Sequence, residues 1–385
     1  MRKWLIGLLV LGAASVGCGG DSGAGDVDDG RSSAETRALM AQISEGLRVV
    51  LPESVGDPPF SNPDRQEEFA AALAMLSDNT TLLERHFREE DQEGRFLARS
   101  VARDAQEIQR TFTQGRRERA GFLVGQIAEN CIACHSRLRA PEEPPLAARL
   151  ITTSELSTLP LEAKAALQMA MRRFDDALVS LERRLEEPDY PALMIGALTD
   201  YLVVSIRVKG DYERPIPVLR RFAARDDLWT TLREDVEYWI ESLPRLRDRA
   251  AGEPDLDVAR ALVEEARGLD PFPGSHRSVA HFVVASALLE RFVLAHGERD
   301  ARSAEAYYLR GVIEAWIGRN LWVTAAPFML ETSIRMAPGE PFARKAYALL
   351  EQETLAAYEG ADEKISSEER ENLDELHALI EGGSR

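Results

Sequence analysis

Two cysteines and a histidine stand together in the segment ENCIACHSRLRAP, residues 129–141, of a chain that has 385 residues and only three cysteines. The spacing Cys-x-x-Cys-His is the pattern of c-type haem attachment. On a helix the two sulfurs share a face and reach the two vinyl groups at one haem edge, while the histidine that follows binds the iron. The motif therefore predicts one covalent haem, attached to Cys131 and Cys134, with His135 as the proximal iron ligand.

Three other uses of the cysteine pair explain the sequence less well. A disulfide within Cys-x-x-Cys can form in an oxidising compartment, but it gives no reason for the adjacent histidine. A zinc site needs a fourth ligand and usually a second pair at similar spacing, and the sequence shows neither. A thioredoxin-like site needs a strand–helix–strand context, whereas the apolar periodicity here is helical.

The third cysteine, Cys18, follows an export signal. A positive pair at positions 2 and 3 precedes a short apolar run, too short to span a bilayer, so residues 1–17 are predicted to be a signal peptide. The run ends in ASVGCGG, which resembles the lipobox of bacterial lipoproteins. The resemblance implies lipid on Cys18 and a periplasmic location, with Gly19 favouring the outer over the inner membrane. The alternative is ordinary signal-peptidase cleavage, with no lipid.

The charge and composition of the rest of the chain limit its partners. The chain has 47 basic and 65 acidic residues, a net charge of −18, so it is not expected to bind nucleic acid, although it can attract basic partners at low salt. Residues 18–32 are rich in Gly, Asp and Ser and predict a flexible tether. After the signal, we expect no stretch long and apolar enough to cross a membrane.

Residues 33–140 predict four amphipathic helices, and so an antiparallel bundle. The first begins at Ser32 or Ser33, the second at Asn62 and the third near Asp91, and the fourth carries the haem motif. The residues expected on the buried faces of the last three helices are Phe69, Leu73, Leu76, Leu83 and Phe87, then Leu97, Val101, Ala105, Ile108 and Phe112, and finally Phe122, Leu123, Ile127, Cys131, Cys134 and Leu138.

With this motif at the end of a fourth helix, residues 33–140 resemble cytochrome c-prime and its low-spin relatives. In CIACHSRLR, Leu138 and Arg139 take the places of the apolar residue and arginine that follow the histidine in that family. The resemblance covers just over a quarter of the chain and implies a four-helix bundle that carries one haem. It also implies Met40 as the distal iron ligand, because the low-spin members carry a methionine near the start of the first helix.

Two of the implied site residues, Arg139 and Met40, have alternative interpretations. Arg139 either contacts a haem propionate or is a solvated arginine near a helix C-terminus, where the dipole favours it. Met40 lies on an apolar stripe, where methionine is more often a core residue than a ligand. The alternatives to Met40 as the distal ligand are Met75, His86 and an iron that has no sixth ligand. A six-coordinate iron suits electron transfer, whereas a five-coordinate iron can bind a small gas.

The second part of the chain, residues 151–360, predicts an all-helical repeat domain without hairpins. The segment resembles tetratricopeptide repeats, which implies stacked helix pairs that dock a protein partner; a generic helical bundle is the alternative. The stretches that carry the resemblance begin at Met171, Val208 and Ile317. A proline-rich linker is expected at 141–150, and residues 361–385 predict a terminal capping helix.

The second part shows no recognisable catalytic constellation. Its histidines are scattered, without a partner at a useful spacing, and His281 on the run HFVVASALL is expected to be a satisfied buried residue. The sequence therefore predicts an all-α, exported c-type cytochrome that carries electrons to or from a partner protein, and not an enzyme. The alternatives are a five-coordinate gas-binding haem protein, and a periplasmic helical scaffold whose haem is structural.

Overall fold

The computed structural model of the chain is helical throughout the residues that it describes, and no strand occurs among them. The predicted all-α class is therefore confirmed. The described residues are 29–54, 58–87, 92–125, 127, 157, 159–188, 194–270, 274–296, 299–317, 326–356, 365 and 367–383.

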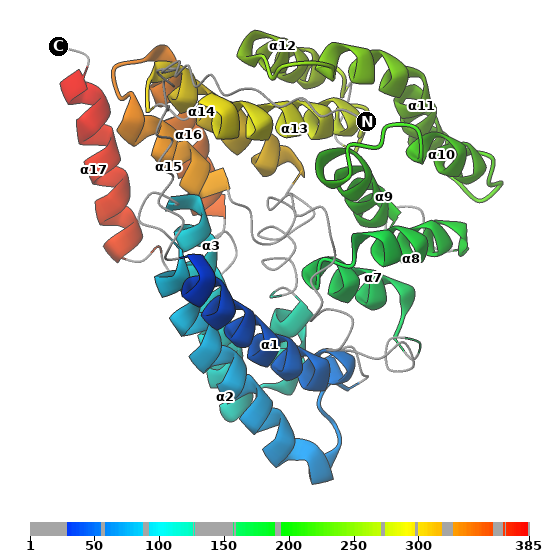
Figure 1. Cartoon of the computed structure of the whole chain (residues 1–385), viewed down its shortest axis with the longest axis vertical. Coiled ribbons are helices and arrows are strands. Elements are labelled where there is room, and N and C mark those ends of the chain that lie inside the picture. The colour runs from blue at the N-terminus through cyan, green and yellow to red at the C-terminus, as the bar shows by residue number, and fades with distance from the viewer. Residues whose placement is uncertain are drawn as a thin grey trace, which may run out of the picture.

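Three long helices, α1, α2 and α3, form the first part of the fold, and each packs against the next (Figure 1). Residues 117–125 and Ile127 are also helical. Short 3-10 turns precede and follow α2. The bounds are α1 (Asp29–Ser54), η1 (Pro63–Arg65), α2 (Gln66–Leu83), η2 (Glu84–His86) and α3 (Gln92–Thr113).

Local sequence signals set several of these ends. The side chain of Asn62 accepts a hydrogen bond from the backbone N–H of Asp64 at 3.0 Å, which is the predicted cap. Gly115 takes a φ of 78° just after α3, a conformation that glycine adopts without strain. The start of α1 differs from the prediction, because the helix begins at Asp29, inside the segment expected to be a tether.

The buried faces of α2 and α3 are the predicted ones, because a 3.6-residue period fixes which side chains share a face. Phe87, also expected on this face, lies beyond the end of α2 and is only partly buried. The other predicted residues are all buried: Phe69, Leu73, Leu76, Leu83, Leu97, Val101, Ala105, Ile108 and Phe112. The fourth segment differs: Phe122, expected inside, is 50% exposed. Ala120, Val124 and Ile127 are the buried residues there, so the buried face is rotated away from Phe122.

The second part of the fold is a succession of helices, most of which pack against the next, and Figure 1 shows them following an arc from green to red. The last of them, α17, lies within the predicted terminal segment. The bounds are α7 (Leu161–Ala170), α8 (Phe174–Glu186), α9 (Met194–Leu202), the π-helix η4 (Val203–Val208), α10 (Pro215–Ala223), α11 (Thr230–Ala250), α12 (Leu256–Arg267), α13 (Val279–His296), α14 (Ala301–Ile317), α15 (Ala326–Met336), α16 (Pro341–Ala356) and α17 (Ser367–Gly383).

Helix α13 of this arc reaches a length and a hydropathy that no stretch after the signal was expected to reach. Its 18 residues have a mean hydropathy of 1.4, which is enough by length and composition to cross a membrane. However, 72% of the helix is buried inside the fold, as in the core helix of a helical protein. The expectation that no second stretch reaches this length and hydropathy is therefore wrong.

Two parts of the arc contact the N-terminal helices. Leu167 and Met171, in and just after α7, are buried in the apolar cluster that also holds the core residues of α1, α2 and α3. Two helices before the other end of the arc, Phe96 of α3 stacks on Phe328 of α15 with ring centroids 5.0 Å apart. Buried Leu97 and Met329 lie in the same small cluster. The helices of the predicted repeat domain thus help to hold the N-terminal helices in place.

Candidate functional site

Most residues of the predicted haem site lie outside the described part of the chain. These residues are Cys131, Cys134, His135 and Arg139, and the predicted lipidation site Cys18 lies outside it as well. Their roles stay predictions.

The described candidates for the distal ligand occupy different environments. Met40 is partly buried on α1 and packs against the N-terminal apolar cluster, which also contains Ile127, four residues before Cys131. Met75 is 36% exposed on α2, and His86 is partly buried in η2. Of the two methionines, only Met40 thus packs against the apolar cluster, and its role as the distal ligand stays a prediction.

The beginning of the fourth helical segment lies against the end of α1. A Cβ atom added at Gly121 would lie 2.9 Å from the backbone oxygen of Ser54 and 2.7 Å from Cβ of Pro59. Real Cβ atoms do not approach this closely, so only glycine permits the contact. The contact fixes one point of the register between these two segments.

Asp200, on α9, is a titratable group that was not among the sequence-based candidates. The pKa of Asp200 is raised to about 7, mainly by burial and also by the nearby carboxylate of Glu162, while the positive charge of Arg207 acts in the opposite direction. Arg207 belongs to the π-helix η4 and donates to Glu314 of α14 at 2.7 Å. The signal in the sequence was a single acid within the apolar run MIGALTDYLVVSI.

His281 is buried, as predicted, with 2% of its surface exposed. Its ring stacks on Tyr238, and Nε2 lies 3.6 Å from a carboxylate oxygen of Glu265. Burial lowers the pKa of His281, in spite of the opposing effect of Glu265. The expected full satisfaction is not observed, because Nδ1 has no hydrogen-bond partner among the described residues.

The described residues hold no group of three or more His, Cys, Asp and Glu side chains placed to bind a metal ion.

Comparisons with known proteins add no assignment. No protein-family model, no curated protein and no solved structure matches the chain significantly.

Proposed function

We propose that the chain is an exported, lipid-anchored c-type cytochrome that carries one covalent haem and transfers single electrons. The Cys-x-x-Cys-His motif at Cys131, Cys134 and His135 is the observation that carries the proposal. The N-terminal helices would form the four-helix bundle around the haem, and the helical repeats would dock the redox partner. Lipid on Cys18 would hold the protein at the periplasmic face of a bacterial membrane, with the outer membrane favoured.

The buried face of the fourth segment supports this use of the motif. Ala120, Val124 and Ile127 are buried at intervals of four and three residues. The same alternation of intervals leads to Cys131 and Cys134. If the helix continues, both sulfurs are on the side of the helix that faces the apolar cluster, where a haem would be shielded from water.

The contact between Gly121 and Ser54 supports Met40 as the distal ligand. If the fourth helix runs antiparallel to α1, as in a four-helix bundle, each residue forward on it is level with one residue back on α1, because both helices rise about 1.5 Å per residue. Fourteen residues on from Gly121 is His135, and fourteen residues back from Ser54 is Met40. The imidazole and the thioether would then be level with each other.

Each residue of the proposed haem site would have a distinct role. Each of the two cysteine thiols would add across a haem vinyl group, forming a carbon–sulfur bond, so that the chain gains the mass of one haem and loses no atoms. His135 and Met40 would bind the iron from its two sides, and Arg139 would contact a propionate. The bound haem would supply a one-electron Fe(III)/Fe(II) couple, and thioether attachment would prevent its loss outside the cell.

The experiment compares Met40→Ala with Met75→Ala, because both remove a thioether from the same group of helices but only Met40 packs against the apolar cluster. The proteins are exported from a host that performs c-type haem maturation, and spectra are recorded for the reduced form with and without carbon monoxide. We expect a low-spin wild type that resists carbon monoxide, a high-spin Met40→Ala that binds it, and a Met75→Ala like the wild type. Immediate binding by the wild type would contradict Met40 ligation and favour a gas-binding haem.

A further inference from the structure

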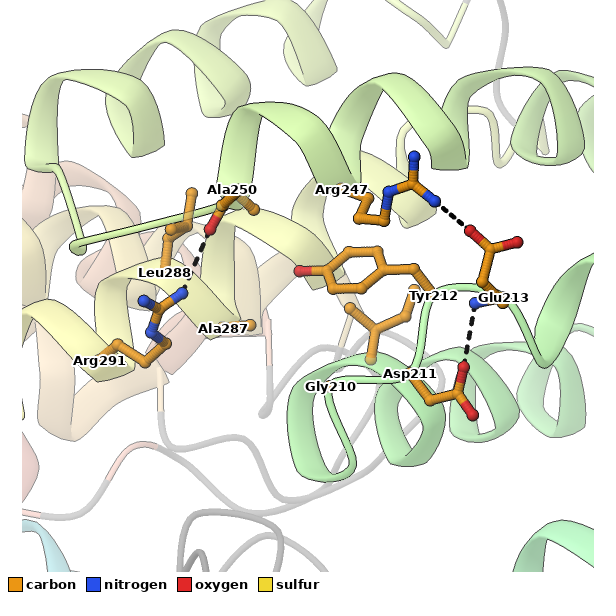
Figure 2. A pocket seen from close by; sticks show the side chains of 11 residues that line it. Gly210, Asp211, Tyr212, Glu213, Arg247, Ala250, Ala287, Leu288 and Arg291 are labelled. Carbon is orange, nitrogen blue, oxygen red and sulfur yellow. Dashed lines mark hydrogen bonds and ion pairs between the residues drawn. The ribbon is translucent and has the colours of Figure 1, made fainter.

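A pocket of about 520 Å³ opens in the second part of the fold, where the segment that follows η4, the end of α11 and the last turns of α13 meet (Figure 2). Its volume is within the range of small-molecule sites, about 300 to 1,000 Å³. The residues that line it are Ile206, Gly210, Asp211, Tyr212, Glu213, Arg247, Ala250, Ala251, Ala287, Leu288 and Arg291.

Much of the lining is apolar. Ile206, Ala250, Ala287 and Leu288 are buried members of the helical core, and they come from three different elements. The ring of Tyr212 adds a partly buried aromatic surface. Such a lining favours a ligand with an apolar body, because transfer of that body from water is favourable by about 25 cal/mol per Å² of apolar area.

Two arginines line the pocket, and their partners differ. Arg247 forms ion pairs with Glu213 and Asp248, so nearby carboxylates already compensate its charge. Arg291 donates to the backbone oxygen of Ala250 at 3.2 Å and to that of Gly252. No carboxylate of the described residues lies within ion-pair distance of Arg291.

Among the described residues, the positive charge of the Arg291 guanidinium is therefore compensated by carbonyl dipoles alone, at the edge of an apolar pocket. A guanidinium has five N–H donors in a planar fork, which matches the two oxygens of a carboxylate. In Figure 2 the hydroxyl end of Tyr212 points toward the side of the pocket on which Arg291 lies. A ligand carboxylate on this side of the pocket would lie on the same side as both the Arg291 guanidinium and the Tyr212 hydroxyl.

The opposite wall limits the ligand to a single negative charge. The side chain of Asp211 accepts hydrogen bonds from the backbone N–H groups of Glu213 and Arg214, both at 3.0 Å, which fixes its carboxylate at the rim. A second carboxylate on the ligand would meet the negative charge of Asp211, whereas the charge of Glu213 is compensated by its ion pair with Arg247. Like charges at close range are repulsive, so a dicarboxylate is disfavoured.

From these contacts we propose that the pocket binds a small organic monocarboxylate with an apolar body, the carboxylate on Arg291 and the body over Ile206, Ala287 and Leu288. The proposal does not depend on the haem. The probe is octanoate, titrated calorimetrically into the full-length exported protein. Octanol serves as the uncharged match, and suberate as the dicarboxylate of the same length. We expect saturable binding of octanoate, and binding of octanol and suberate that is weaker by about tenfold or more.

Two variants separate binding from folding. Arg291→Gln removes the guanidinium, and we expect the dissociation constant for octanoate to rise by about tenfold or more. Its control is Arg233→Gln, because Arg233 also donates to two backbone oxygens, of Ala223 at 2.6 Å and Arg225 at 2.7 Å, but does not line the pocket. Ala251→Phe adds a ring at an exposed position of the lining, so it should block binding while the melting temperature is unchanged.

Three results would overturn the proposal. The first is the absence of saturable octanoate binding to the wild type. The second is octanol binding as tight as octanoate binding, which would show that the arginine does not recognise the charge. The third is a dissociation constant that neither Arg291→Gln nor Ala251→Phe changes, which would place the binding elsewhere.

Discussion

Replacement of Gly311 by alanine tests the packing of the second part of the fold where α14 and α15 approach each other closely. Gly311 lies on α14, and a Cβ atom there would be 2.7 Å from both Cγ and Cδ2 of Leu330 on α15. The backbone nitrogen of Leu330 would be 3.3 Å away. Carbon atoms pack best at about 3.5 to 4.0 Å, so the added methyl group would overlap its neighbours by about 1 Å.

The surroundings leave little room for relief of this overlap. Leu330 is fully buried, so its side chain cannot turn out into water, and α14 must move away from α15. Overpacking of this kind costs about 1 to 3 kcal/mol. Alanine recovers about 0.5 to 1 kcal/mol of that cost because it has the higher helix propensity. The difference spans about 0 to 2.5 kcal/mol, and because Leu330 is fully buried we expect a net loss of about 1 to 2 kcal/mol in the free energy of unfolding.

Gly196→Ala is the matched control. Gly196 lies inside α9, and apart from its chain neighbours and the backbone of its own helix, no atom of the described residues comes within 4 Å of an added Cβ. This variant should therefore keep the free energy of unfolding or raise it by up to about 1 kcal/mol. Urea unfolding followed by far-UV circular dichroism, with the slope held equal across variants, compares both with the wild type.

A double-mutant cycle with Leu330→Ala gives the sharper test. Removal of the leucine side chain should itself cost about 2 to 5 kcal/mol, but it leaves space that the methyl group at position 311 can occupy. The double variant should thus be more stable than the sum of the two single changes implies, by about 1 kcal/mol or more. Additive effects, or a Gly311→Ala variant as stable as Gly196→Ala, would refute the reasoning.

Three further changes have defined expectations. Asp200→Asn removes a carboxyl group whose pKa of about 7 exceeds its unfolded value of about 3.9, so the wild type should lose stability as pH rises from 4 to 7. The variant should lack that loss and be more stable at pH 8 by up to about 4 kcal/mol; identical pH profiles in urea unfolding would contradict this expectation. His281 is neutral in the fold, where its pKa is lowered, so the wild type should lose stability as pH falls below about 6.5, and His281→Phe should lose less over the same range. Phe328→Ala removes the stack on Phe96, and amide exchange should become faster in α3 and α15 but not in α11; unchanged exchange in α3 would exclude a stabilising role for this contact.

The sequence was sufficient for those features that one helix determines by itself. The buried faces of α2 and α3 follow from the 3.6-residue period, and the cap at Asn62 follows from side-chain chemistry within two residues. Each of these signals is local, so no knowledge of the tertiary partner was needed.

Features that depend on a distant partner were missed. Phe122 and Val124 are both apolar, and only the packing of the segment decides that Val124 is inside and Phe122 half-exposed. Met171 joins the N-terminal cluster although it lies beyond the predicted linker, since the position of α7 relative to α1 is a tertiary property. The wall of the pocket near Arg291 likewise combines segments more than 80 residues apart in sequence, Ile206 and Arg291 among them.

The central claim is that sulfur atoms of Cys131 and Cys134 bind one haem covalently. The most direct test is the intact mass of the exported protein, made with the haem maturation machinery, together with its pyridine haemochrome spectrum. The account predicts a gain of one haem mass and a thioether-type spectrum, both absent in Cys131→Ala/Cys134→Ala. A wild-type mass equal to that of polypeptide plus lipid, with no Soret absorption, would contradict it.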